Sequence, residues 1–276
     1  MEPVMHPSPY LLEVNNLTTR FDITDGFFKR TSSRVHAVED ISFQIKRGET
    51  LSLVGESGCG KTTTGRTIMG LQEATSGEIL FNGQSVLEHS REERLAFCRS
   101  VQMIFQDPFT SLNPRMTLLN IVGEPMVVNG VGSVAERRER VGELLKVVGL
   151  RPEYMNRFPH AFSGGERQRI GIARALALNP RLVVADEPVS SLDVSVQAQV
   201  LNLLMELQEE LKLTYIFVAH DLSVVRHIAD TVAVMYVGKM AETGPTEEIF
   251  EDPKHPYSAA LLSAVPIPDP RVKTNR

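Results

Sequence analysis

The sequence has few features that would assign it to a specialised class of protein. Only two cysteines, Cys59 and Cys98, occur among 276 residues. They are too few for a disulfide framework and lack the spacing of metal ligands, which favours a reducing compartment. The formal net charge of −5 argues against a protein that binds nucleic acid through bulk basic charge. We therefore expect an ordinary globular protein with no nucleic acid as a partner.

Long hydrophobic runs are also missing. An apolar run such as 215–219 is far shorter than the ~20 residues that a membrane-spanning helix requires. The first ten residues have neither a basic start nor an apolar stretch, so no signal peptide is expected. If the protein serves transport, we expect the membrane pore to belong to other chains.

The hydrophobic residues, 42% of the chain, suffice for a full core, and their spacing alternates between strand and helix periods. Strands are predicted at 41–45, 51–54, 78–81, 101–105, 182–185 and 214–219, and helices at 62–69, 133–148, 164–178, 195–211 and 222–228. The Asn82-Gly83 pair predicts a hairpin turn. The alternation predicts a mainly parallel sheet covered by helices on both faces, with a helical insertion at about 107–160.

Residues 55–62 (GESGCGKT) match the phosphate-loop pattern G-x-x-x-x-G-K-S/T, between a predicted strand and a predicted helix. Glycines let consecutive backbone N–H groups surround phosphate oxygens, and the helix N-terminus adds partial positive charge. We expect Lys61 to reach the β- and γ-phosphates and the Thr62 hydroxyl to bind Mg²⁺. A glycine-rich turn that matches by chance is the alternative, and the flanking strand and helix argue against it.

Residues 182–187 (LVVADE) form a predicted buried strand that ends in two carboxylates, Asp186 and Glu187. Ligands of open α/β sheets bind at the carboxyl ends of strands, so both acids should face the phosphate loop. Asp186 suits a direct or indirect contact with Mg²⁺, and Glu187 suits a general base that polarises the attacking water. For an isolated strand, a polar loop start would be the alternative.

Residues 162–169 (FSGGERQR) lie between these two motifs. Ser163 and Glu166 have the spacing of a capping box, which is a purely structural explanation. Gly164 and Gly165, however, are poor choices for the first turn of a helix, and they make sense if a phosphate approaches the backbone there. This segment resembles the signature motif of the ATP-binding cassette (ABC) family.

The resemblance extends to single residues elsewhere in the chain. Gln106 matches the family's Q-loop glutamine, Asp193 ends a match to the D-loop, and His220 matches the switch histidine that senses the γ-phosphate. Phe21 falls where the family places an aromatic ring that stacks on adenine, although the phenylalanines at 27–28 lie close by. Small departures from the family pattern remove none of these residues, so a competent site is implied.

The resemblance implies ATP and Mg²⁺ as cofactors. The implied nucleotide-binding residues are Phe21, Gly55, Glu56, Ser57, Gly58, Cys59, Gly60, Lys61, Thr62, Thr63, Ser163, Gly164, Gly165, Glu166, Asp186 and Asp193. The implied catalytic residues are Glu187, His220 and Gln106, and the implied metal-binding residues are Thr62, Gln106 and Asp186.

The implied fold is an α/β P-loop NTPase (RecA-like) core with a mainly parallel sheet. The family adds an N-terminal antiparallel β-subdomain and an inserted α-helical subdomain, here at about 107–180. The ABC ATPase domain would span 10–245, and a C-terminal extension of the oligopeptide-transporter type would span 246–276.

Within the family, the chain is similar to the ATP-binding subunits of oligopeptide and dipeptide importers. The similar segments are 102–108, 111–115, 193–200 and 252–257, and the pattern is closer to the second ("F-type") of the two ATPases of such systems. This resemblance implies a peripheral subunit on the cytoplasmic face of the inner membrane. Its partners would be a second ATP-binding subunit, two transmembrane permease subunits and, indirectly, an extracytoplasmic solute-binding protein.

Two kinds of alternative remain open at this point. A non-transport ABC ATPase of DNA repair or translation is disfavoured because only 108 positions separate Gly55 from Ser163, without room for a long coiled coil, and because the chain has one cassette. An exporter is disfavoured by the subgroup resemblance alone. Within the importers, nickel or sugars are the alternatives to peptides.

Overall fold

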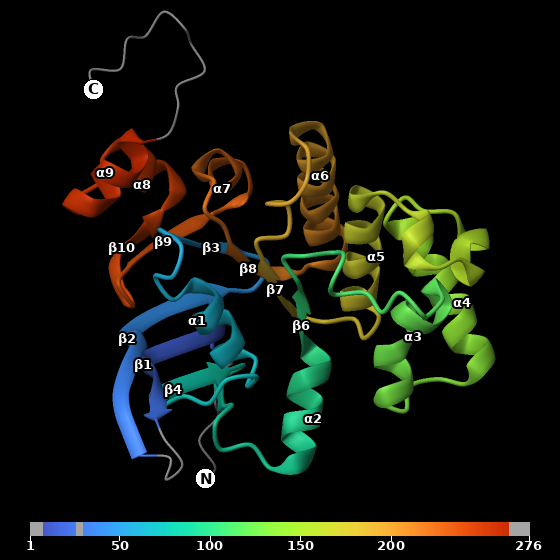
Figure 1. Cartoon of the computed structure of the whole chain (residues 1–276), viewed down its shortest axis with the longest axis horizontal. Coiled ribbons are helices and arrows are strands. Elements are labelled where there is room, and N and C mark those ends of the chain that lie inside the picture. Colours follow the sequence, from blue (N-terminus) through green and yellow to red (C-terminus); the bar gives the residue numbers. More distant parts are fainter. Residues whose placement is uncertain (1–7, 26–29, 265–276) are drawn as a thin grey trace, which may run out of the picture.

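Figure 1 shows the chain as a computed structural model that describes residues 8–25 and 30–264. A small antiparallel sheet lies at one side of a larger sheet, and a group of helices lies at the other side. The C-terminal helices lie beside the edge of the larger sheet that is farthest from this helical group.

The small sheet has four strands in the order β2-β1-β4-β5, and neighbouring strands run antiparallel. Their bounds are β1 (Tyr10–Asp25), β2 (Arg30–Lys46), β4 (Ser76–Phe81) and β5 (Gln84–Ser85). Alternate residues of β2, namely Ile41, Phe43 and Ile45, are buried, as the strand periodicity predicts. The Asn82-Gly83 pair connects β4 to β5, which confirms the predicted hairpin.

The larger sheet has six strands in the order β10-β9-β3-β8-β7-β6. Their bounds are β3 (Thr50–Val54), β6 (Val101–Ile104), β7 (Leu182–Asp186), β8 (Thr214–Val218), β9 (Thr231–Tyr236) and β10 (Lys239–Pro245). All neighbours are parallel except β9 and β10. Every residue of β3, β7 and β8 is buried, because a parallel sheet is covered on both faces.

This sheet separates two hydrophobic cores. In β7, Leu182 and Val184 belong to the core shared with the small sheet, whereas Val183 and Ala185 belong to the core beneath the helices. Successive side chains of a strand point to opposite faces, so a short strand of apolar residues is held from both sides. At about 25 cal/mol per Å² of apolar surface removed from water, this burial on both faces stabilises the position of each strand.

Helix α1 (Lys61–Ile68) packs against strands of both sheets, and it follows the phosphate loop directly. Helices α6 (Val194–Leu211) and α7 (Leu222–Ile228) contribute buried leucine and valine residues to the core beneath the helices, on the opposite face of the larger sheet from the small sheet. The remaining helices outside the insertion are α2 (Arg91–Ser100), α8 (Thr246–Glu251) and α9 (Pro256–Ser263).

The helical insertion lies between β6 and β7. It comprises α3 (Leu118–Val128), α4 (Val134–Val147), the short 3-10 helices η1 (Pro152–Asn156) and η2 (Pro159–Ala161), and α5 (Gly164–Leu176). Helix α4 begins at a capping box formed by Ser133 and Glu136, and it buries Leu144 and Leu145 on one face. The sequence predicted a helix at 133–148, which agrees with this start.

The predicted fold class is confirmed, including the antiparallel N-terminal sheet and the mainly parallel second sheet. The periodicity did not single out eight of the strands and α-helices: β1, β5, β9, β10, α2, α3, α8 and α9. Helix α2 buries only Phe97, and β10 is an edge strand with no buried residue, so neither carries a strong apolar signal. In the part of the chain that the structure describes, no helix combines the length and apolar composition needed to cross a membrane.

Candidate functional site

Four neighbouring parallel strands end at the same edge of the larger sheet. In sheet order β3-β8-β7-β6, they lead into the phosphate loop, His220, the Asp186-Glu187 pair and Gln106. Residues more than a hundred positions apart in the chain therefore meet, because the carboxyl ends of parallel strands lie side by side. The strand order also places Glu187 between His220 and Gln106.

The phosphate loop connects β3 to α1 through a backbone conformation that requires glycine. Gly60 has a φ of 109°, and a Cβ there would lie 2.3 Å from the carbonyl oxygen of Ala37. No side chain caps the start of α1 and no acid occupies its first turn, so its first N–H groups favour an anion. Lys61 is buried, and its Nζ donates to the carbonyl oxygens of Gly55 at 2.7 Å and Glu56 at 2.8 Å.

The loop is tied to β7 by one hydrogen bond. The hydroxyl of Thr62 donates to Oδ1 of Asp186 at 2.8 Å. Asp186 is 3% exposed, and desolvation by burial raises its pKa, while the hydrogen bond from Thr62 opposes that rise. Arg66 and Lys61 also act to lower this pKa, but desolvation outweighs them, so a cation beside Asp186 would further stabilise its ionised form.

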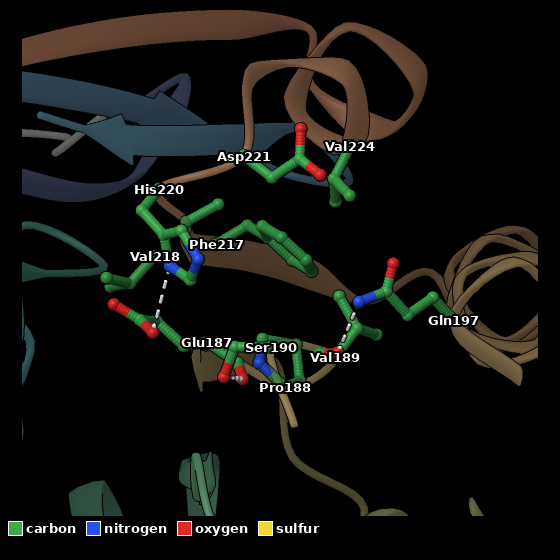
Figure 2. Close-up of a pocket in the computed structure, with 11 residues that line it drawn as sticks. Glu187, Pro188, Val189, Ser190, Gln197, Phe217, Val218, His220, Asp221 and Val224 are labelled. Atoms are coloured by element: carbon green, nitrogen blue, oxygen red, sulfur yellow. Dashed lines mark hydrogen bonds and ion pairs between the residues drawn. The ribbon is translucent and has the colours of Figure 1, made fainter. Parts of the chain in front are cut away.

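Glu187 is positioned by side chains from the two adjacent strands. Its Oε2 accepts a hydrogen bond from Nε2 of Gln106 at 2.9 Å. The same oxygen lies 3.1 Å from Nδ1 of His220 (Figure 2). An ionised carboxylate only accepts hydrogen bonds, so in this arrangement Nδ1 of His220 carries the hydrogen. The other ring nitrogen, Nε2, is then available for a ligand.

The backbone of Glu187 adopts an unusual conformation, with a φ of 45°. This left-handed region is uncommon for a residue other than glycine, asparagine or aspartate, and such strain costs about 1–3 kcal/mol. Three hydrogen bonds hold it there. Its N–H donates to the Val218 carbonyl at 3.0 Å, and its carbonyl accepts from the Ser190 hydroxyl at 3.1 Å and from the Ser190 N–H at 3.3 Å. Strain of this kind concentrates at functional sites, and here it directs the side chain toward His220 (Figure 2).

These groups face a cleft of about 580 Å³. The cleft is lined by Val35, His36, Ala37, Ser57, Gly58, Gly60, Lys61, Thr62, Thr63, Gln106, Glu187 and His220. Most of the predicted phosphate-binding and catalytic residues therefore lie together. The lining residues of β2 were missed by sequence reasoning, because an alternating strand gives no signal of which exposed residues border a ligand.

Several predicted nucleotide-binding residues lie outside the cleft lining. Phe21 is 37% exposed and pairs directly with Val35 of β2, so it neighbours the cleft without lining it. Glu56 and Cys59 lie within the phosphate loop, but they do not line the cleft, and the Cys59 side chain is buried. Asp186 does not line the cleft, but it accepts a hydrogen bond from the hydroxyl of Thr62, which does.

Another group of predicted residues lies at the start of α5 and in the segment before α6. Ser163, Gly164, Gly165, Glu166 and Asp193 are all absent from the cleft lining. Helix α5 packs against α3, α4, α6 and β6, whereas α1 packs against β1, β2, β7 and β8. The chain thus carries two separate regions that its sequence associates with phosphate.

The two glycines of α5 differ in what surrounds them. A Cβ on Gly165 would lie 2.4 Å from Cγ1 of Val196, so close packing of α5 on α6 requires glycine there. A Cβ on Gly164 would meet only ordinary contacts, the nearest at 3.5 Å to Leu192. Internal packing therefore explains why position 165 is glycine, but it does not explain the glycine at position 164. Ser163 and Glu166 do form the capping box that starts α5.

Residues 38–190 match the ABC transporter family. The chain belongs to this family. Residues 241–276 match a second family, the C-terminal region of oligopeptide and dipeptide transporters. The resemblance that the motifs indicated is therefore confirmed for the ATPase and for the oligopeptide-transporter subgroup.

The sequences of curated relatives align with nearly the whole length of this ABC ATPase. It is 55% identical to the oligopeptide transport ATP-binding protein OppF of Bacillus subtilis, over 96% of this chain and 86% of that protein. It is 51% identical to the glutathione import ATP-binding protein GsiA of Pectobacterium atrosepticum, over 96% of this chain but 42% of that longer protein.

Solved structures of ABC ATPases share the fold. The cassette MJ0796, whose dimeric structure in a post-hydrolysis state holds ADP and Pi, has a TM-score of 0.74 at 30% identity, covering 85% of this chain and 98% of that one. The cbiO1 subunit from Clostridium perfringens has a TM-score of 0.75 at 30% identity, covering 89% of this chain and 92% of that one. The chain is thus an ATP-binding ABC ATPase.

Asp186→Asn is expected to raise the melting temperature of the nucleotide-free ABC ATPase at neutral pH. Since the pKa of Asp186 is raised on folding, the folded chain carries a penalty for the ionised form that asparagine avoids. The gain should be about 2–4 °C for each kcal/mol of penalty. It should disappear as the pH falls below the ordinary pKa of aspartate, about 3.9, where both states are protonated.

Thermal unfolding across this pH range measures the effect. The matched control is Asp252→Asn, which changes an exposed aspartate and should give no gain. An Asp186→Asn chain that is less stable than the parent at neutral pH would contradict the assignment of a desolvated carboxylate.

Gly165→Ala is expected to lower the free energy of unfolding by about 1–3 kcal/mol, because the new methyl group overlaps Val196. Gly164→Ala should leave stability unchanged or slightly raised, since alanine is the better helix former. Chemical denaturation of the two variants separates the effects. Equal destabilisation by both changes would show that packing against α6 does not distinguish the two positions.

Proposed function

We propose that this ABC ATPase is the energising subunit of an importer that carries peptides across the cytoplasmic membrane, and that it acts as a peripheral subunit on the cytoplasmic face. The proposed ATP hydrolysis rests on one observation: the phosphate loop, Glu187, His220 and Gln106 all border the same cleft. The substrate class is inferred from ATP-binding relatives named for oligopeptide transport or for import of glutathione, itself a short peptide, and from the matched C-terminal region.

The phosphate loop would bind the nucleotide by its backbone. The residues between Ser57 and Thr63 that line the cleft would present N–H groups and the positive end of α1 to the phosphates. Lys61 would exchange its bonds to the Gly55 and Glu56 carbonyls for bonds to the β- and γ-phosphates. Phe21, which neighbours the cleft through Val35, is proposed to stack on adenine.

The residues beside the phosphate loop fit Mg²⁺. Thr62 and Asp186 offer a hydroxyl and a carboxylate 2.8 Å apart, and Gln106 offers an amide oxygen to the same cleft. No group of three or more His, Cys, Asp or Glu residues suited to a metal occurs in the described part of the chain. This sparse oxygen set suits Mg²⁺, which keeps several waters and binds substrate phosphates. When bound, Mg²⁺ would neutralise charge on the phosphate oxygens.

Glu187 is proposed as the general base that polarises the attacking water. Gln106 and His220 both contact its Oε2, so we assign the other oxygen, Oε1, to the water. His220 would hold the carboxylate through Nδ1 and address the γ-phosphate through Nε2. Because the three side chains follow three adjacent strands, their relative positions are fixed by the sheet.

The region at the start of α5 is proposed to act on the nucleotide of a second ATP-binding subunit, which is either another copy or a paralogue. Ser163, Gly164, Gly165, Glu166 and Asp193 lie outside this chain's own cleft, so a partner's nucleotide is the one that they could contact. The similar cassette MJ0796 is dimeric with ADP and Pi bound. ATP would then hold two subunits together, and its hydrolysis would release them.

Other partners are proposed from the importer assignment. They are two transmembrane permease subunits that contain the pore and a solute-binding protein that selects the peptide outside the membrane. We assign the ATPase domain to residues 10–245, the helical subdomain that meets the permeases to about 107–180, and the C-terminal extension to 246–276; the boundaries of these regions remain predictions.

Glu187→Gln is expected to lower the rate of ATP hydrolysis by about 10²–10⁴-fold, because the amide cannot accept the proton of the attacking water. The affinity for ATP should change little, since the phosphate loop stays intact. Steady-state hydrolysis and equilibrium ATP binding separate the two effects. Glu209→Gln, an exposed change on α6, is the matched control. Hydrolysis within tenfold of the parent rate would exclude Glu187 as the base.

Lys61→Ala is expected to abolish uptake of labelled di- and oligopeptides in cells that depend on this subunit, because the phosphates lose their main cation. Glutathione, nickel and a sugar should be tested in parallel. If peptide uptake persists while nickel or sugar uptake collapses, the peptide assignment fails and the importer assignment survives. If no uptake changes although ATP binding is lost, a non-transport function is indicated.

A further inference from the structure

The C-terminal segment reaches the phosphate loop from the edge of the larger sheet. Helix α9 begins with Pro256 in its first turn, where proline is favoured because its missing N–H would be unpaired anyway. Nδ1 of His255 accepts a hydrogen bond from the Tyr257 N–H at 3.1 Å and so caps the helix. Glu242 of β10 accepts from the backbone N–H groups of Lys254 at 2.7 Å and His255 at 3.1 Å.

These contacts fix the start of α9 against β10, and they direct Tyr257 toward the loop. Its ring packs on Tyr236, the last residue of β9, with 4.3 Å between the ring centroids. Its hydroxyl accepts a hydrogen bond from the backbone N–H of Glu56 at 3.2 Å. Burial raises the pKa of Tyr257, so the hydroxyl stays neutral at physiological pH.

Glu56 is therefore held at both of its peptide groups. Tyr257 engages its N–H, and Nζ of Lys61 engages its carbonyl oxygen at 2.8 Å. Glu56 and Tyr257 do not line the cleft, so this support reaches the loop from outside the nucleotide site. If Lys61 turns to the phosphates as proposed above, its bond to the Glu56 carbonyl is lost, while the hydrogen bond from the Glu56 N–H to Tyr257 does not compete with the nucleotide.

We propose that Tyr257 is a positioning residue for the phosphate loop: it holds the first turn of the loop in its binding shape when Lys61 moves to the nucleotide. This inference rests on the proposed role of Lys61. It assigns to the C-terminal extension a part in ATP binding, since the sequence His255-Pro256-Tyr257 supplies the cap, the helix start and the hydroxyl in three successive residues. A loop ordered before binding loses less conformational entropy on binding.

Tyr257→Phe tests the proposal, because it removes the hydroxyl and keeps the ring that packs on Tyr236. The expected result is a rise of about two- to tenfold in the Kd for a non-hydrolysable ATP analogue and in KM for ATP, as befits the loss of one neutral hydrogen bond. The kcat at saturating ATP should change less than about twofold. In the nucleotide-free chain, hydrogen exchange of the Glu56 amide should accelerate by a similar factor.

The matched control is Tyr215→Phe. The Tyr215 hydroxyl donates to the Leu204 carbonyl at 3.1 Å inside the core, so its loss should lower the melting temperature and leave the Kd unchanged. The proposal is overturned if Tyr257→Phe leaves both the Kd and the Glu56 exchange rate at parent values, or if Tyr215→Phe raises the Kd equally. A parent chain that does not bind the analogue would instead refute the proposed function.

Discussion

The parallel pairing of β3, β8, β7 and β6 is the constraint on which the rest of the structure depends. Each strand is short, and every residue of the four except Gln102 is buried, so the apolar side chains enter a core on both faces of the sheet. Burial on both sides fixes the strands in position. The residues that directly follow the strands are therefore also held in defined positions. A hydrolytic site assembled from four separate segments needs such a rigid edge, because errors of about 1 Å lower catalytic rates substantially.

Several polar residues at this edge adopt arrangements that cost free energy, and the stability of the surrounding fold offsets that cost. Asp186 is buried with a raised pKa, Glu187 has a left-handed backbone, and Lys61 is buried against backbone carbonyls. Each arrangement would relax if the sheet and its two cores were less stable. These features are suited to a ligand that brings negative charge and metal ions, since ligand binding then relieves costs already present in the free chain.

The regions associated with phosphate divide into two kinds. One faces the chain's own cleft at the sheet edge, and the other lies at the start of α5, where half-buried Gly164 has no packing contact that requires glycine. Tyr257 adds a third contribution from the C-terminal extension, behind the phosphate loop. Under the proposed function, the core sheet would serve one nucleotide, and the start of α5 would present a second surface to another subunit.

The sequence by itself determined the fold class, the phosphate loop and the acidic strand end. Short apolar strands and glycine spacing are local properties, so they can be recognised within a short stretch of sequence. It also indicated His220 and Gln106, but only through resemblance to a family. Tertiary structure alone decided that both contact one oxygen of Glu187, that Val35 borders the cleft, and that Tyr257 meets Glu56 across 201 positions. It also gave Gly165 a packing role on Val196. These contacts depend on strand order and on helix packing between distant segments, which no local pattern of residues encodes.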